Sequence, residues 1–263
     1  MRGYFGTDLQ QRLQRQADEW AQRVTHTPGL CNAGRVLSCD DVDTFGLEAC
    51  AALVERDGGL GFRLVPAERT GAITAFLAER GCRIDWWDTF AGAREACLPL
   101  AQPIVAAGPP PSFRLVQILP GASEAELTRL QAFLAGNGLA PFSRATLAGE
   151  TVKGRFFALF DEAGEIAATA FAYLPHNEFS AFAGHAWGGL AAVAPAHRGK
   201  ALGRYINARA AVAAFEELGA ATFYEQVSAE NTVSRRMVEA CGLTLHPTLK
   251  SGLAAVGAEK FTR

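Results

Sequence analysis

From residue 113 onward the chain alternates between segments patterned as strands and as helices, and this order limits the folds open to it. Strand-like apolar segments lie at 113–119, 155–160, 166–173, 188–193 and 221–227, with further extended segments at 243–246 and 252–261. Helical patterns lie at 123–134, 202–218 and 231–240, and Ser123 with Glu126 forms a capping box at the first. The order β-α-β-β-β-α-β-α-β, with a last strand at 252–261, predicts an α/β domain.

The segment Gly108-Pro-Pro-Pro-Ser112 marks a boundary before this domain. Consecutive prolines continue neither a helix nor a central strand, and they favour an extended spacer. We therefore predict two domains, 1–110 and 111–263. In the first, apolar residues at helical spacing predict an amphipathic helix over 9–24, and 61–90 has the pattern of strand, helix and strand.

Charge and composition exclude several classes of protein. The formal net charge is -2, so no basic field favours nucleic acid as a partner. No apolar run has the length of a membrane span, and the polar start MRGYFGTDLQ lacks the apolar core of a signal peptide. None of the six cysteines forms a CxxC pair. We expect a cytoplasmic protein with reduced thiols, no membrane partner and no metal.

The segment Val193-Ala-Pro-Ala-His-Arg-Gly-Lys-Ala-Leu-Gly-Arg204 connects a predicted strand to a predicted helix. A helix N-terminus has unpaired N–H donors and a partial positive charge, which together favour bound phosphate. Arg198, Lys200 and Arg204 add full charges there. A turn with solvated basic residues would have the same local sequence. Neither GxxxxGK[ST] nor GxGxxG is present in the segment.

Arg198-Gly-Lys-Ala-Leu-Gly203, with Val193-Ala-Pro195 before it, resembles motif A of the GNAT superfamily of acyl-CoA-dependent N-acyltransferases. The following strand, then Asn231 and Ser234 on a helix, then Gly242, resemble the family's next segment. The resemblance covers about 112–263. It implies a GNAT fold, α/β with a mixed, mostly antiparallel sheet flanked by helices, preceded by a smaller α/β domain like the degenerate N-terminal half of tandem GNAT proteins.

The resemblance also implies the activity: transfer of an acetyl or other acyl group from acetyl-CoA to a primary amine of a small molecule or peptide, by direct attack in a ternary complex. The acyl donor is a cosubstrate, and no metal is implied. An acyl-CoA-binding sensor or partner module with little catalysis is the alternative. The sequence leaves open which amine is the acceptor and whether the chain forms a homodimer.

By position, the resemblance assigns the acyl-CoA contacts to the strand before motif A, to the turn and to the later helix. The residues are Ala191, Ala192, Val193, Arg198, Gly199, Lys200, Ala201, Leu202, Gly203, Arg204, Asn231, Ser234 and Arg235. Asn231 also has the sequence of an ordinary helix N-cap. Two positions depart from the family pattern. Ala201 replaces a glycine, which is harmless if its φ is helical, and Val238 replaces the tyrosine often proposed as the acid.

Candidates for the proton-transfer groups are Glu225 and His185 as bases and Tyr224 as an acid. Each also has a structural interpretation, since strand alternation can turn Glu225 to either face and single histidines and tyrosines often pack in cores. His176 and Glu178 are placed near the acceptor or in a solvated loop. In the first domain, Trp86, Trp87 and Phe90 are assigned to core packing or to the acceptor pocket.

Overall fold

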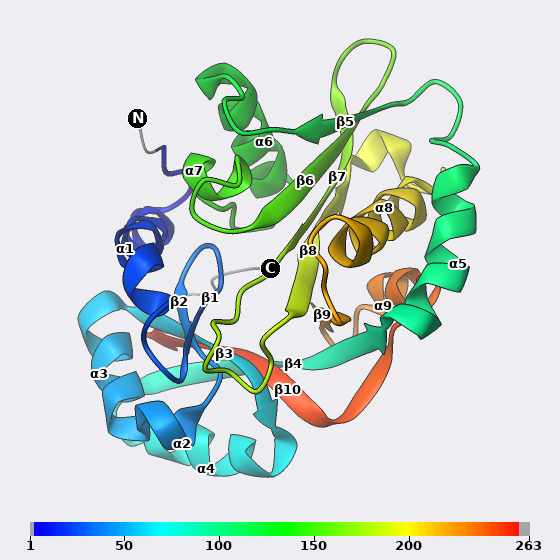
Figure 1. Ribbon diagram of the computed structural model, residues 1–263. Helices are drawn as coiled ribbons and strands as arrows, with labels where there is room; N and C mark the ends of the chain where they lie inside the picture. Colours follow the sequence, from blue (N-terminus) through cyan, green and yellow to red (C-terminus); the bar gives the residue numbers. More distant parts are fainter. Residues whose placement is uncertain (1–2, 258–263) are drawn as a thin grey trace.

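The chain folds around one continuous sheet, seen in the computed structural model, which describes residues 3–257 (Figure 1). Within these residues ten strands follow the order β1-β2-β3-β10-β4-β9-β8-β7-β6-β5. Neighbouring strands are antiparallel except for the parallel pairs β2–β3 and β8–β9. The predicted α/β fold with a mixed, mostly antiparallel sheet is therefore confirmed.

The elements have the following bounds. The strands are β1 Leu30–Asn32, β2 Leu37–Cys39, β3 Gly59–Pro66, β4 Cys82–Ala93, β5 Arg114–Ile118, β6 Gly154–Phe160, β7 Ile166–Tyr173, β8 His185–Val193, β9 Thr222–Val227 and β10 Thr244–Val256. The helices are α1 Asp8–Val24, α2 Val42–Phe45, α3 Leu47–Asp57, α4 Ala67–Ala78, α5 Arg94–Ala106, α6 Glu124–Gly136, α7 Arg144–Leu147, α8 Leu202–Glu216 and α9 Thr232–Glu239, with a 3-10 turn at Pro195–His197.

The sheet runs through both predicted domains. Strand β4 of the N-terminal part pairs antiparallel with β9, and the last strand, β10, lies between β3 and β4. The backbone hydrogen bonds of the sheet thus hold the N-terminal strands beside the C-terminal ones. The boundary at 110 remains a prediction about domain organisation. The sheet places residues of β3 and β4 close to the end of β9.

Helices cover the two faces of the C-terminal strands. Helix α8 packs with α5 on one face, where Ile206 and Phe215 join a buried apolar cluster with Phe223 of β9. Helices α6 and α7 cover the other face, to the left of the strands in Figure 1, around a cluster that includes Leu130 and Phe156. Because successive strand residues point to opposite faces, each strand supplies both clusters. A third cluster lies between β3, α3 and α4.

Most predicted elements lie within a few residues of the observed ones, and the differences have local causes. Helix α5 was not predicted, and it contains Pro99 and Pro103, which normally interrupt helices. The two extended segments predicted at 243–246 and 252–261 are wrong as separate strands, because β10 is one strand. Its register shifts between Leu245 and Lys250, around Pro247, which has no N–H to donate. Residues 258–261 of that prediction lie outside the described residues.

Two further expectations concern the whole chain. All six cysteines are free and buried, in agreement with the expected thiols. Of the helices in residues 3–257, none combines the length and the apolar character needed to cross a bilayer.

Candidate active site

A cavity opens where β8 and β9 separate. The parallel register of the two strands runs from His185–Thr222 to Gly188–Glu225 and stops there. Beyond this pair, a cavity of about 230 Å³ is lined by Gly189, Leu190 and Ala191 on β8, by Gln226 and Val227 on β9, and by Ser228 after it. Backbone groups that leave a ladder need other partners. The separated strands therefore form a slot whose walls offer backbone hydrogen bonds to a ligand.

The sequence of β8 produces this separation. Leu190 has a φ of 51°, and the register of β8 with β7 shifts beside it, between Thr169 and Phe171. The hydroxyl of Thr169 donates to the Leu190 carbonyl at 2.8 Å and fixes the bulge. A Cβ on Gly188 would lie 2.2 Å from a Phe223 ring atom. The glycine thus permits close packing next to the point of divergence.

The turn after β8 leads to the N-terminus of α8, which has 15 residues. Gly199 and Ala201 both have left-handed φ values, 82° and 59°. An alanine at 201 was expected to be harmless if its φ were helical, and its φ is not helical. The turn holds Ala201 in the left-handed conformation, which glycine adopts more easily. Among the described residues no side chain caps α8, so its first N–H groups are available to an anion.

The charged side chains of this turn lie at the surface. Arg198, Lys200 and Arg204 are exposed, and Arg198 Nε donates to the Val193 carbonyl at 3.4 Å. Lys200 Nζ lies 3.2 Å from His197 Nδ1. The predicted phosphate-binding residues thus surround one helix N-terminus at the end of β8, where a negatively charged ligand would meet donors and positive charge.

Helix α9 contributes its N-terminus to the cavity. Asn231 caps the helix by accepting from the Ser234 N–H at 3.0 Å, and both residues line the cavity. Arg235 instead forms an ion pair with Asp88 and lies over the Phe90 ring, with its guanidinium carbon 5.2 Å from the ring centroid. Asn231 therefore both caps the helix and lines the cavity. Arg235 is engaged by protein groups.

Glu225 is the one candidate for proton transfer that lines the cavity within the described residues. Its side chain points toward α8, where Asn207 Nδ2 donates to Oε1 at 2.8 Å. The residue is only 4% exposed. Burial raises the pKa of Glu225 to about 7, against the lowering effect of the Asn207 hydrogen bond. A carboxyl with this pKa can accept a proton near neutral pH.

The other two candidates lie away from the cavity lining. His185 is half-buried beside Phe182, and burial lowers its pKa. Tyr224 is fully buried, its hydroxyl lies 3.0 Å from His176 Nε2, and burial raises its pKa well above the usual value. Val238 is buried in the cluster beneath α8 and brings no proton donor to the position of the family tyrosine.

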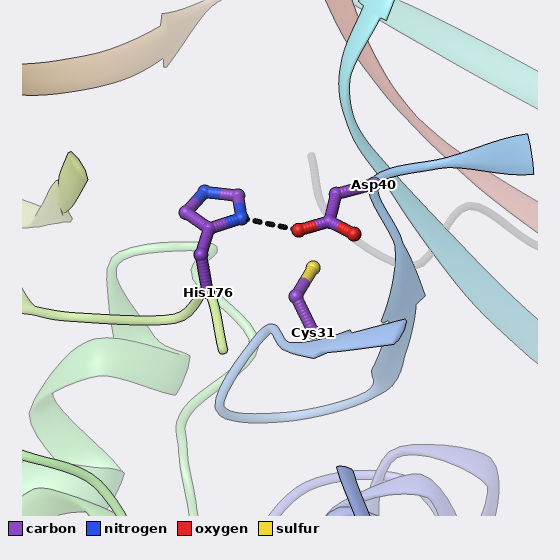
Figure 2. Close-up of side chains that lie close together, drawn as sticks. All are labelled: Cys31, Asp40 and His176. Atoms are coloured by element: carbon purple, nitrogen blue, oxygen red, sulfur yellow. Dashed lines mark hydrogen bonds and ion pairs between the residues drawn. The ribbon is translucent and has the colours of Figure 1, made fainter. Parts of the chain in front are cut away.

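Cys31, Asp40 and His176 form a buried group that the sequence did not predict. One ligand-type atom from each lies within 4.8 Å of the others, and Figure 2 shows the three side chains converging. His176 Nδ1 lies 2.6 Å from Asp40 Oδ2, so this ring nitrogen faces the carboxylate and its other nitrogen faces Tyr224. The sulfur of Cys31 lies beside Asp40 in Figure 2. We interpret the group as an Asp40–His176–Tyr224 hydrogen-bond chain that orients Tyr224.

The N-terminal part supplies further residues of the cavity. Arg35, Ser38, Arg63 and Trp87 line it beside the C-terminal residues. Trp87 therefore lies at the pocket, whereas Trp86 and Phe90 pack in apolar clusters. The two arginines were not predicted. The sequence signal for Arg63 is its place inside Gly59-Leu-Gly-Phe-Arg-Leu-Val-Pro66, an otherwise apolar strand, because a charge there is expected only with a specific role.

Several proteins of known structure have a similar fold. A GCN5-related N-acetyltransferase from Kribbella flavida aligns with a TM-score of 0.58 and 16% identity, covering 94% of this chain and 96% of that one. One from Sphaerobacter thermophilus has a TM-score of 0.51 and 16% identity, covering 86% and 76%. A tandem GNAT protein from the clavulanic acid biosynthesis pathway has a TM-score of 0.53 and 16% identity, covering 81% and 69%.

Sequence comparison agrees with the structural similarity. No curated protein matches the chain. Residues 131–243, however, match the family described as the acetyltransferase (GNAT) family. This range contains β8, the turn at Arg198, α8, β9 and α9. The part of the chain that carries the site therefore matches the GNAT acetyltransferase family in sequence, and the chain shares the fold of GNAT proteins.

Proposed function

We propose that the protein transfers an acetyl group from acetyl-CoA to a primary amine by direct attack in a ternary complex. The observation that carries the proposal is the slot between β8 and β9, which Glu225 lines, together with the basic turn that follows β8 at the N-terminus of α8. The residues fit the donor. The helix N-terminus and Arg198 suit a pyrophosphate, and the unpaired strand edges suit an amide-bearing arm.

Acetyl-CoA supplies a thioester whose carbonyl carbon forms a bond to the amine nitrogen while the bond to sulfur breaks. The chain's own groups hold the reactants and receive the proton. Glu225 accepts a proton from the amine, directly or through a water molecule. Backbone N–H groups of Gly189–Ala191 stabilise the carbonyl oxygen as it becomes negative. Coenzyme A leaves as a thiolate, a good leaving group, and takes its proton from water, because Val238 has none to donate.

A binding module with little catalysis is the second candidate. Its support is Val238, which is buried and has no proton to donate. The two candidates share the donor site and differ in turnover. Binding of acetyl-CoA without acetylation of any amine in a broad screen would favour the module. The expected cytoplasmic location, the absence of membrane and nucleic-acid partners and the absence of a metal remain predictions.

Replacing Arg198 with Ala is expected to weaken acetyl-CoA binding about 10-fold, because one charge-assisted contact to phosphate is lost. Isothermal titration calorimetry measures this, with Arg129→Ala as the matched control. Arg129 is an exposed arginine on α6 that pairs with Glu165, outside the cavity lining. Adenosine monophosphate serves as the ligand control. A folded wild-type protein that does not bind acetyl-CoA would contradict the proposed function.

The turn predicts opposite effects for two neighbouring substitutions. Ala201→Gly is expected to raise the free energy of unfolding by about 0.5–1 kcal/mol, because it removes a side chain from a left-handed residue. Gly199→Ala is expected to lower it by about 1 kcal/mol for the same reason, since a Cβ there meets no atom within 4 Å among the described residues. Urea unfolding measures both. Destabilisation by Ala201→Gly would show that the turn has another conformation.

Glu225→Gln is expected to lower turnover of the best amine found in a screen by about 100-fold, because the proton acceptor is lost. It is also expected to stabilise the fold above pH 7. The carboxyl pKa rises from 4.5 to about 7 on folding, so Glu225 destabilises the fold increasingly between pH 4.5 and pH 7, fully above pH 7 and not below about pH 4.5. The stabilisation should be on the order of 2–3 kcal/mol at pH 8 and should disappear near pH 4.5.

Urea unfolding at pH 8 and pH 4.5 measures this difference, and Glu162→Gln in an exposed hairpin is the control. The control should show the same stability relative to the wild type at both pH values. Equal effects of Glu225→Gln at the two pH values would mean that Glu225 titrates as an ordinary carboxyl.

A further inference from the structure

Two arginines of the N-terminal part reach the cavity between β8 and β9. Arg63, on β3, is 5% exposed although it is charged, and its guanidinium carbon lies 5.1 Å from the centroid of the Trp187 ring. Arg35 follows β1, and its Nη1 donates to the Ala140 carbonyl at 2.6 Å. Both residues line the cavity. Buried cations require a compensating partner.

The unpaired polar atoms around this cavity are all of one kind. Among the described residues, the buried side-chain atoms without a hydrogen-bond partner that belong to its lining are Ser38 Oγ, Arg63 Nη1, Trp187 Nε1 and Gln226 Nε2. Each of the four can donate a hydrogen bond. The buried acceptors without a partner, such as Asp40 Oδ1, belong to residues outside the lining. These four donors have no acceptor within residues 3–257 of the protein, and a ligand that supplies acceptors would satisfy them.

The carboxyl groups nearest to Arg63 are bonded to other side chains. Arg63 takes part in none of the ion pairs found in residues 3–257. Asp40 Oδ2 is bonded to His176 and Ser180 at 2.6 and 2.7 Å. Glu225 is bonded to Asn207. Burial and the charge of Arg63 lower the pKa of Arg35 to about 10, as two cations in one buried region require.

We propose that the acceptor is a small primary amine that carries a carboxylate, and that Arg63 binds this carboxylate. The inference rests on the proposed acetyl transfer, and it names the substrate class of the same cavity. A guanidinium presents parallel N–H donors that match the two oxygens of a carboxylate. The cavity of about 230 Å³ must hold the acetyl group as well as the acceptor, which favours a compact amino acid over a large acceptor. The carboxylate is held by the N-terminal part while the amine faces Glu225.

Matched amines test this assignment. The twenty standard amino acids and their carboxamides are incubated with acetyl-CoA and the purified full-length protein, and the released thiol is detected. At least one amino acid is expected to react with a kcat/KM about 10-fold or more above that of its amide. Alanine and its phosphonate analogue, 1-aminoethylphosphonate, separate carboxylate from phosphate recognition. Preference for the phosphonate, or equal use of acids and amides, would overturn the assignment.

Arg63→Met keeps an apolar stem and removes the charge. It is expected to lower kcat/KM for the amino acid about 10- to 100-fold and to change that for the amide less than about 3-fold. Arg129→Met is the surface control and should change neither. An equal loss for acid and amide would show that Arg63 has only a structural role. Circular dichroism and acetyl-CoA calorimetry show whether the variant remains folded.

A binding measurement separates this inference from the proposed function. The indole N–H signal of Trp187, assigned with Trp187→Phe, is followed by NMR while each amino acid or its amide is added. The carboxylate forms are expected to shift this signal in the wild type and not in Arg63→Met. This readout does not depend on turnover, so a protein that fails to bind acetyl-CoA but shows the shift would contradict only the proposed transfer. Absence of any shift with carboxylates would overturn the inference.

Discussion

The separation of β8 from β9 after the Gly188–Glu225 pair is the feature on which the site depends. Two neighbouring strands that part inside a sheet leave buried backbone groups without partners, and such groups are unfavourable unless a ligand or water replaces the lost bonds. The bulge at Leu190 produces the separation and the following turn places α8 at its end. Donor binding and a buried Glu225 both follow from this single departure from regular pairing.

The N-terminal part completes the cavity because the sheet is continuous. Strand β10 lies between β3 and β4, and β4 pairs with β9, so the sheet fixes Arg63 of β3 relative to the C-terminal strands. The ladder hydrogen bonds hold both sides of the pocket in one register. A rigid framework of this kind suits a site that must hold two reactants close together.

The sequence was sufficient to predict the fold class, most strands and the turn at Arg198, because these depend on local patterns and short motifs. It could not predict which residues meet across the sheet. Arg63 and Glu225 are 162 residues apart in the sequence, as their numbers give, and only the insertion of β10 and the pairing of β4 with β9 bring their strands to one cavity. The side to which Glu225 points and the left-handed φ of Ala201 also depend on this three-dimensional context.

A crystal structure of the protein with acetyl-CoA tests the central claim most directly. Our account predicts that the thioester lies between Gly189–Ala191 of β8 and the end of β9 at Gln226 and Val227. The pyrophosphate should lie on the N–H groups at 198–203, and the carbonyl carbon should face Glu225. A complex in which β8 and β9 close and the cofactor binds elsewhere would contradict the claim that their separation forms the acyl-transfer site.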